Sequence, residues 1–206
     1  MAAGRPVLGE LVPAVLRRRL VDHAARYRFT PPDPRGGGAF AMASLTGTDS
    51  AVFGELLAWL APRAGGLPGW SSFVPNEVSY QRYEAGGRGL PPHRDQRYYL
   101  HAIVIVTLTG EARFALLGSA DPGDVVDGWT TRPGEVIALA GWSPHGDADP
   151  RPYHQVDAPD HGHRLMLQLR QNAAATPHLD LTRSPFTPKE LAEAHHLTTL
   201  PDSATL

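Results

Sequence analysis

A histidine and an aspartate stand two residues apart in LPPHRDQRYY, which spans residues 90–99. In extended backbone, side chains two positions apart project to the same side of the chain. His93 and Asp95 can therefore bind one cation together. A single His-x-Asp pair is weak evidence, because the chain contains ten histidines. A metal site requires a further ligand from another part of the chain.

A second histidine suited to this role lies in RPYHQV, residues 151–156, where the residue types indicate a short strand. With His154 added, the set contains two imidazoles and one carboxylate, which leave three positions of an octahedron open and favour non-haem Fe(II). His145 is the alternative to His154, in the segment WSPHGDADP. Because turn-forming residues surround His145, His154 is the preferred ligand.

Composition narrows the chemistry further. The chain has no cysteine, which excludes disulfides and thiolate ligands, so that any metal must be bound by His, Asp or Glu. A formal net charge of −2 over 206 residues provides no general attraction to a polyanion. Nucleic acid is therefore disfavoured as a partner, but a group of arginines near the metal motif leaves it open: Arg82, Arg88, Arg94 and Arg97.

Helical and extended patterns occupy different parts of the chain. Apolar residues at helical spacing predict helices over residues 8–27 and 51–60. A capping box with proline at its first helical position predicts a third helix from residue 187. Between them, turns rich in Gly, Pro and Asp separate predicted strands at residues 76–84, 101–109, 112–117, 135–140, 153–156 and 163–171.

Helices followed by a run of short strands are typical of the α+β class, with the strands in a barrel or a double-sheet jelly roll. The length fits one domain over residues 1–206. We expect a mainly helical flank at 1–70, a jelly-roll catalytic core at 76–171, and a C-terminal extension with a short helix at 172–206.

The segment HRLMLQLRQ, residues 163–171, separates two kinds of side chain by parity. Its three leucines share one face, and Arg164, Met166, Gln168 and Arg170 share the other. The leucine face is expected to pack under the helices. Because an apolar core does not accept unpaired arginines, the other face predicts a polar interior, with an exposed sheet face as the alternative.

Arg164 follows His154 by ten residues, and this completes a recognisable pattern. His-x-Asp, a distal His and an Arg about ten residues later resemble the Fe(II)/2-oxoglutarate-dependent dioxygenases. The resemblance covers residues 76–171, where YQRYEAGGRGLPPHRD is similar to the strand, turn and first metal motif, and RPGEVIALAG to the strand before the second histidine. The pair Arg164 and Arg170, and Gln81-x-Tyr83 in place of Asn-x-Tyr, are similar to the AlkB-like branch.

The resemblance implies a double-stranded β-helix in which His93, Asp95 and His154 ligate Fe(II). Arg164 would pair with the distal carboxylate of 2-oxoglutarate, and Tyr83 and Gln81 would donate hydrogen bonds to this cosubstrate. Arg170 lies about 20 Å further along an extended strand, so it is expected to meet the other end of the cosubstrate, or the substrate. Met166 stands where many members have Ser or Thr, so one hydrogen bond to the cosubstrate is missing or replaced by Tyr83.

The implied reaction consumes O2 and 2-oxoglutarate, releases succinate and CO2, and hydroxylates or otherwise oxidises a C–H bond of a substrate. Asp95 favours hydroxylation, since halogenating relatives lack this carboxylate. We expect a small-molecule substrate that is polar or anionic. The alternatives are oxidative dealkylation of nucleic acid, hydroxylation of a protein side chain, and a jelly-roll binding module without enzymatic activity.

Nothing in the sequence predicts a membrane partner. No apolar run approaches the roughly 20 residues that span a bilayer. Residues 1–27 contain three consecutive arginines and resemble an amphipathic helix more than a signal peptide. We therefore expect a cytoplasmic protein, with its oligomeric state and the identity of its substrate left open.

Overall fold

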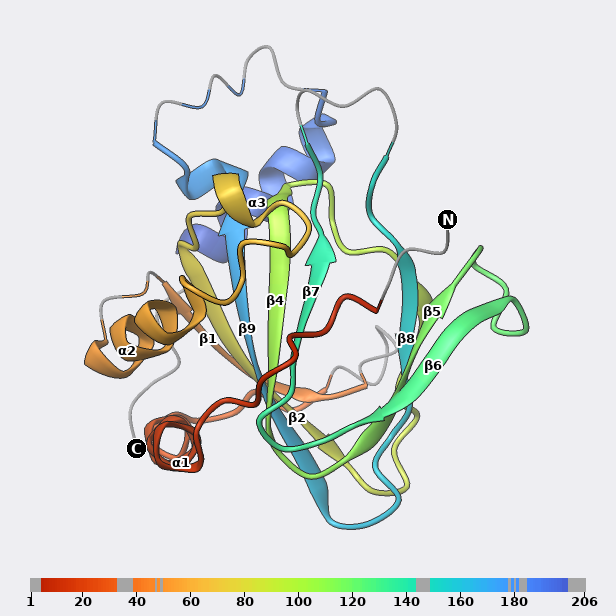
Figure 1. Cartoon of the computed structure of the whole chain (residues 1–206). Coiled ribbons are helices and arrows are strands. Elements are labelled where there is room, and N and C mark those ends of the chain that lie inside the picture. Colours follow the sequence, from red (N-terminus) through yellow and green to blue (C-terminus); the bar gives the residue numbers. More distant parts are fainter. Residues whose placement is uncertain are drawn as a thin grey trace.

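Two antiparallel sheets form the core, and the chain alternates between them (Figure 1). The computed structural model describes residues 5–32, 39–46, 48, 50–143, 149–177, 179, 181 and 185–199. The five-stranded sheet contains, in spatial order, β1 (Ala41–Thr46), β2 (Glu77–Glu84), β9 (His163–Asn172), β4 (Tyr99–Thr109) and β7 (Val136–Ala140). The four-stranded sheet contains β3 (Leu90–His93), β8 (Tyr153–Val156), β5 (Ala112–Leu117) and β6 (Val125–Thr131). This architecture is a double-stranded β-helix, which confirms the predicted α+β fold class.

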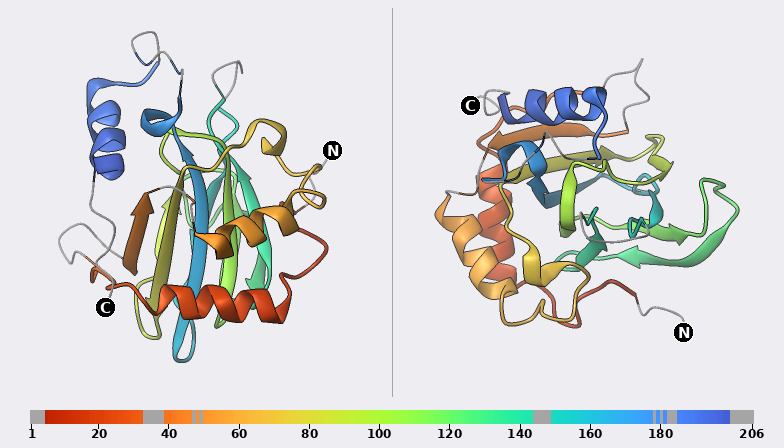
Figure 2. Two further views of the ribbon diagram at one scale, coloured as in Figure 1. Left: turned by 90° about the vertical axis from the view of Figure 1, so that its left-hand side faces the viewer. Right: turned by 90° about the horizontal axis from the view of Figure 1, so that it is seen from above.

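Helices α1 (Ala14–Ala24) and α2 (Ala51–Leu60) lie together against the outer face of the five-stranded sheet, whereas α3 (Pro188–Thr199) lies apart from them (Figure 2). Short 3-10 turns occur at Trp70–Ser72 and Ala173–Ala175. Among the described helices, none combines the length and apolar character needed to cross a bilayer.

The central strand β9 separates two hydrophobic clusters. Its leucines, among them Leu167, pack with the apolar residues of α1 and α2 on the outer side of the sheet. Met166, one position earlier, belongs to the second cluster, which lies on the inner face. The predicted division of this strand into a leucine face under the helices and an interior face is confirmed.

The first helix is shorter than the predicted range of 8–27. Residues before it run along the free edge of β7, where the Leu8 amide donates to the Val136 carbonyl at 3.0 Å. This pairing protects a sheet edge that would otherwise expose unpaired backbone groups. The helix begins after Pro13, so the apolar residues before it serve the sheet and not the helix.

Three strands lie outside the predicted set, namely β1, β3 and β6. β3 contains two prolines and pairs with β8 alone, which is the edge position where a sheet tolerates proline. β6 (Val125–Thr131) lies between the strands predicted at 112–117 and 135–140, where the sequence predicts a turn, so the prediction was wrong for this part of the connection. The actual turn closes earlier, with the Gly118 amide bonded to the Asp124 carbonyl at 2.9 Å.

The other elements agree closely with prediction. α2, β5 and β8 have the predicted bounds, and β2, β4, β7 and β9 begin or end within two residues of them. The capping box of α3 is formed: the Glu190 amide donates to Thr187 Oγ1 at 3.2 Å, and the Thr187 amide donates to Glu190 Oε2 at 2.8 Å.

Packing between β9 and the two N-terminal helices can be tested with Leu167→Ala. Leu167 is fully buried, so its truncation is expected to lower the free energy of unfolding by about 2–5 kcal/mol. Leu11 is 56% exposed, and Leu11→Ala should change it by less than about 0.5 kcal/mol. Urea unfolding of both variants provides the measurement. A loss below about 1 kcal/mol for Leu167→Ala would contradict the described packing.

Candidate metal centre and cosubstrate pocket

Strand pairing brings the two candidate histidine ligands together. His93 at the end of β3 stands directly opposite His154 in β8, and their ring centroids lie 4.2 Å apart. His154 Nε2 lies 3.6 Å from Asp95 Oδ2. One ligand atom from each of the three residues lies within 4.8 Å of the others. The donor set is thus the one that suits a divalent iron with open positions.

Backbone carbonyls orient both imidazole rings. His93 Nδ1 is bonded to the Pro91 carbonyl at 2.8 Å, and His154 Nδ1 to the Pro152 carbonyl at 3.3 Å. Since a carbonyl oxygen can only accept, each Nδ1 must donate, which leaves the Nε2 lone pair for a metal. Burial lowers the pKa of His154, although the nearby Asp95 opposes this shift. His154 is therefore neutral at physiological pH, as a metal ligand must be.

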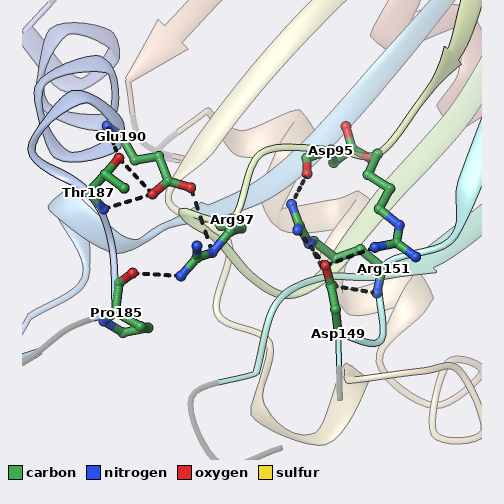
Figure 3. Close-up of polar contacts among 8 residues, drawn as sticks. Asp95, Arg97, Asp149, Arg151, Pro185, Thr187 and Glu190 are labelled. Atoms are coloured by element: carbon green, nitrogen blue, oxygen red, sulfur yellow. Dashed lines mark hydrogen bonds and ion pairs between the residues drawn. The ribbon is translucent and has the colours of Figure 1, made fainter. Parts of the chain in front are cut away.

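A cluster of charged residues fixes the loop that carries Asp95 (Figure 3). Arg151 binds Asp149 through Nε at 2.8 Å and also donates to the backbone carbonyl of Asp95. Arg94 binds the same carboxylate at 3.2 Å, and its guanidinium lies 4.2 Å from the ring centroid of Tyr153. Hydrogen bonds from Arg151 lower the pKa of Asp149 to about 2, so this cluster is fully charged at neutral pH. It joins the first metal motif to the start of β8.

A second contact joins the same loop to α3. Arg97 donates to the Pro185 carbonyl at 2.6 Å and lies 3.6 Å from Glu190 Oε1, at the capping box of the helix (Figure 3). Further along α3, Ala194 is buried and Leu197 lines the cavity next to the metal ligands. The C-terminal helix is therefore part of the pocket wall, a role that the sequence did not indicate.

The cavity has a volume of about 380 Å³ and is lined by the three candidate ligands together with Gln81, Tyr83 and Arg170. Gln81 Nε2 donates to Gln168 Oε1 at 2.8 Å, and the Tyr83 hydroxyl donates to Gln81 Oε1 at 3.2 Å. Burial raises the pKa of Tyr83 well above its ordinary value, so its hydroxyl remains a hydrogen-bond donor. These residues reach the same cavity as the metal ligands, whereas their contact with a cosubstrate stays a prediction.

Arg164 is fully buried beside this cavity, against two residues that line it. Its guanidinium lies 5.9 Å from the Tyr83 ring centroid, and Nη1 donates to the Met166 sulfur at 3.0 Å. Nη2 donates to Thr107 Oγ1 at 3.0 Å, and Nε has no hydrogen-bond partner among the described residues. Burial lowers the pKa of Arg164, but a guanidinium remains charged in proteins.

No carboxylate is directly paired with Arg164 in the part of the chain that the structure describes, although the charge of Glu135 acts on it from further away. A buried cation without a counter-charge costs several kcal/mol. An anionic ligand that replaces the weak sulfur contact would remove this cost, so the site fits a carboxylate of 2-oxoglutarate.

Thr107 is a functional candidate that sequence reasoning missed. It lies in a run that is apolar on both faces, which hides its hydroxyl among core residues. Parity could have identified it, because Thr107 shares the inner face of β4 with Ile103 and Ile105. Its hydroxyl accepts from the Arg164 guanidinium, and Thr107 stands opposite Met166 in the neighbouring strand.

Arg170 lies further along the same face of β9 and has a different environment. It stands opposite Glu77 in β2, and the two side chains form a buried ion pair at 2.6 Å. Arg170 also donates to Ser79 Oγ at 3.0 Å. Its charge is thus balanced within the chain, unlike that of Arg164. The sequence did not single out Glu77, although it shares the face of β2 that carries Gln81.

The alternative ligand His145 lies outside the described residues, so the structure makes no comparison between it and His154. The assignment of iron ligands to individual residues stays a prediction, supported by the geometry of His93, Asp95 and His154.

No protein-family model matches the sequence, and neither does any curated protein. Among solved structures, OsALKBH1 matches with a TM-score of 0.57 and 17% identity over 83% of this chain and 100% of that chain. A prolyl-4-hydroxylase from Pseudomonas putida matches with a TM-score of 0.51 and 13% identity over 82% of this chain and 94% of that chain. At such low sequence identity, the similarity shows a common fold and does not by itself show an activity.

The charged cluster around Asp95 makes a prediction about metal affinity. Asp149→Asn removes the charge that orients both Arg94 and Arg151, so it is expected to weaken Fe(II) binding about 10- to 100-fold. Anaerobic titration measures this. Asp157→Asn is the matched control, since Asp157 forms only an exposed, 3.8 Å ion pair with Arg113. Equal affinity in wild type and Asp149→Asn would show that the cluster does not hold the ligand.

Proposed function

We propose that the protein is an Fe(II)- and 2-oxoglutarate-dependent dioxygenase that hydroxylates, or otherwise oxidises a C–H bond of, a small molecule and releases succinate and CO2. The observation that carries this proposal is the fully buried Arg164 without a carboxylate partner among the described residues, beside the cavity that contains the metal-ligand set. The fold supports it, because the AlkB homologue and the prolyl-4-hydroxylase are 2-oxoglutarate/Fe(II) dioxygenases.

The chain's role at the metal is to present two neutral imidazoles and one carboxylate in fixed positions. His93 and His154 are oriented by backbone carbonyls, and the loop of Asp95 is fixed by Arg151. Three ligands of this kind leave open positions for a cosubstrate and for O2. The iron and 2-oxoglutarate, when bound, supply the activation of O2.

The chain's role at the cosubstrate is to bind one carboxylate deep in the sheet. The Arg164 guanidinium can form two parallel hydrogen bonds to a carboxylate, and Thr107 supplies a hydroxyl next to it. Met166 must turn away from Nη1 to admit the carboxylate, which an unbranched side chain can do at low cost. Tyr83 and Gln81 then face the remainder of the cosubstrate as donors, and Arg170 lies towards its other end or the substrate.

A small, polar or anionic molecule suits the cavity better than nucleic acid. Its volume of about 380 Å³ lies at the lower end of ligand pockets. A nucleic-acid surface needs cations that are free to meet phosphates. Three of the four arginines near the metal motif already form ion pairs: Arg82 with Glu84, Arg94 with Asp149, and Arg97 with Glu190. The predicted cytoplasmic location rests on the sequence alone and is part of this proposal.

Anaerobic Fe(II) and 2-oxoglutarate provide the direct test. Wild-type protein is expected to form a weak visible absorption band. Arg164→Gln is expected to lower the affinity for 2-oxoglutarate about 100-fold, equivalent to about 3 kcal/mol for the lost charged hydrogen bonds. Arg164→Gln should not destabilise the ligand-free fold, because it removes an uncompensated buried charge. Arg113→Gln, at an exposed ion pair, is the control. The absence of a band in wild type, or an unchanged affinity in Arg164→Gln, would contradict the proposal.

Thr107 makes a separate prediction. Thr107→Val removes the hydroxyl next to Arg164 and should weaken 2-oxoglutarate binding about 5- to 10-fold, the effect of one hydrogen bond. Thr107→Ser should retain wild-type affinity. Thr131→Val removes another buried hydroxyl, bonded to the Ala112 carbonyl, and should reduce stability without affecting this affinity. If Thr107→Val binds the cosubstrate as well as Thr107→Ser does, Thr107 has no part in binding.

A further inference from the structure

Glu77 connects three parts of the pocket wall through one buried carboxylate. Its oxygens accept from Arg170 Nη2 at 2.6 Å, from the Tyr99 hydroxyl at 3.2 Å and from Asn172 Nδ2 at 3.0 Å. Asn172 Nδ2 also lies 3.2 Å from the Ala194 carbonyl of α3. Glu77 is only 5% exposed, so its charge acts mainly on these neighbours and is little screened by water.

Arg170 faces the same cavity as the metal ligands. It lines the cavity together with Tyr98 and Tyr99, and its guanidinium lies 4.6 Å from the Tyr99 ring centroid. Burial by itself lowers the pKa of Arg170, but the nearby carboxylates, Glu77 before Asp95, contribute to raising it overall.

Arg170 retains hydrogen-bonding capacity after its charge has been balanced. Nη2 is used by Glu77 and Ser79, whereas Nε is buried and has no partner among the described residues. A charge-balanced guanidinium still donates to a carbonyl oxygen or a ring nitrogen. The Arg170–Glu77 pair as a whole is neutral, so it gives a second buried anion little net attraction.

The other arginine in the cavity lining, Arg94, is held by residues outside that lining. It shares the Asp149 carboxylate with Arg151 and stacks on Tyr153. Tyr153 alternates with His154 along β8, so it lies on the face of the strand away from the metal ligands. Of the two arginines in the described lining, Arg170 is therefore the one left to meet a substrate, and Glu77 balances its charge.

We infer that Glu77 determines substrate specificity by neutralising Arg170, so that the substrate is a neutral compound with a hydrogen-bond acceptor, such as an amide, and not a carboxylate or phosphate. This inference rests on the proposed function and narrows its polar or anionic substrate to a neutral, polar one. The apolar and aromatic side chains of the same cavity suit a flat or apolar body for this compound: Phe40, Met42, Tyr98, Tyr99 and Leu197.

Matched acids and amides test the inference on the full-length protein with Fe(II) and 2-oxoglutarate under anaerobic conditions. The probes are benzoate and benzamide, phenylacetate and phenylacetamide, and indole-3-acetate and indole-3-acetamide, with dissociation constants measured by ligand-observed NMR. Wild-type protein is expected to bind at least one amide about tenfold or more tightly than its acid. Equal binding, tighter binding of the acids, or no binding of any amide overturns the inference.

Charge variants separate specificity from structure. Glu77→Gln leaves Arg170 uncompensated and should shift the acid-to-amide ratio about tenfold or more towards the acid. Ser79→Ala removes a contact to the same guanidinium without changing charge, so it should retain the wild-type ratio. The double variant Glu77→Gln/Arg170→Gln removes both charges and should restore amide preference, including where Glu77→Gln alone folds poorly. An unchanged ratio in Glu77→Gln overturns the inference.

The visible band of the Fe(II)–2-oxoglutarate complex is recorded on the same samples. If wild-type protein forms the band but does not prefer amides over acids, the role of Glu77 is refuted and the dioxygenase proposal stays intact. Absence of the band in wild type overturns both.

Discussion

β9 is the central strand of the five-stranded sheet, and its two faces have opposite requirements: one must be apolar and the other carries charged side chains. Its leucines must pack under α1 and α2, which places Arg164 and Arg170 in the interior between the sheets. Charged groups in such a position must be paired, either by the chain or by a ligand. The rest of the pocket follows from this constraint, because the neighbouring strands β2 and β4 supply the partners of both arginines.

The two arginines resolve the constraint differently. Arg170 stands opposite Glu77, and the chain itself supplies the counter-charge. Arg164 stands opposite Tyr83, which has a hydroxyl and an aromatic face but no charge at neutral pH. Arg170 is therefore a charge-balanced part of the cavity wall, whereas Arg164 lacks a directly paired anion and is suited to bind one. Under the proposed function, this difference separates the place of the cosubstrate from the place of the substrate within one cavity.

The candidate metal ligands depend on the smaller sheet. β3 and β8 are short, and prolines limit the hydrogen bonds that β3 can make. Their pairing aligns His93 with His154, while the charged cluster around Asp149 holds the loop of Asp95 in place. Ion pairs thus supply the rigidity that a short, irregular pair of strands lacks. Rigid ligands matter because a metal site loses affinity when its ligands must be ordered on binding.

Local patterns in the sequence determined the alternation of β9, the bounds of α2, β5 and β8, and the capping box of α3. They also pointed to the candidate metal ligands His93 and Asp95. Such features are readable because periodicity and short motifs act over a few residues. Only the tertiary structure decided that β1, β3 and β6 are strands, since these segments owe their conformation to a partner strand. It also decided which arginine has a counter-charge. Glu77 and Arg170, like Thr107 and Arg164, are distant in the chain and meet only through strand register, which no local pattern encodes.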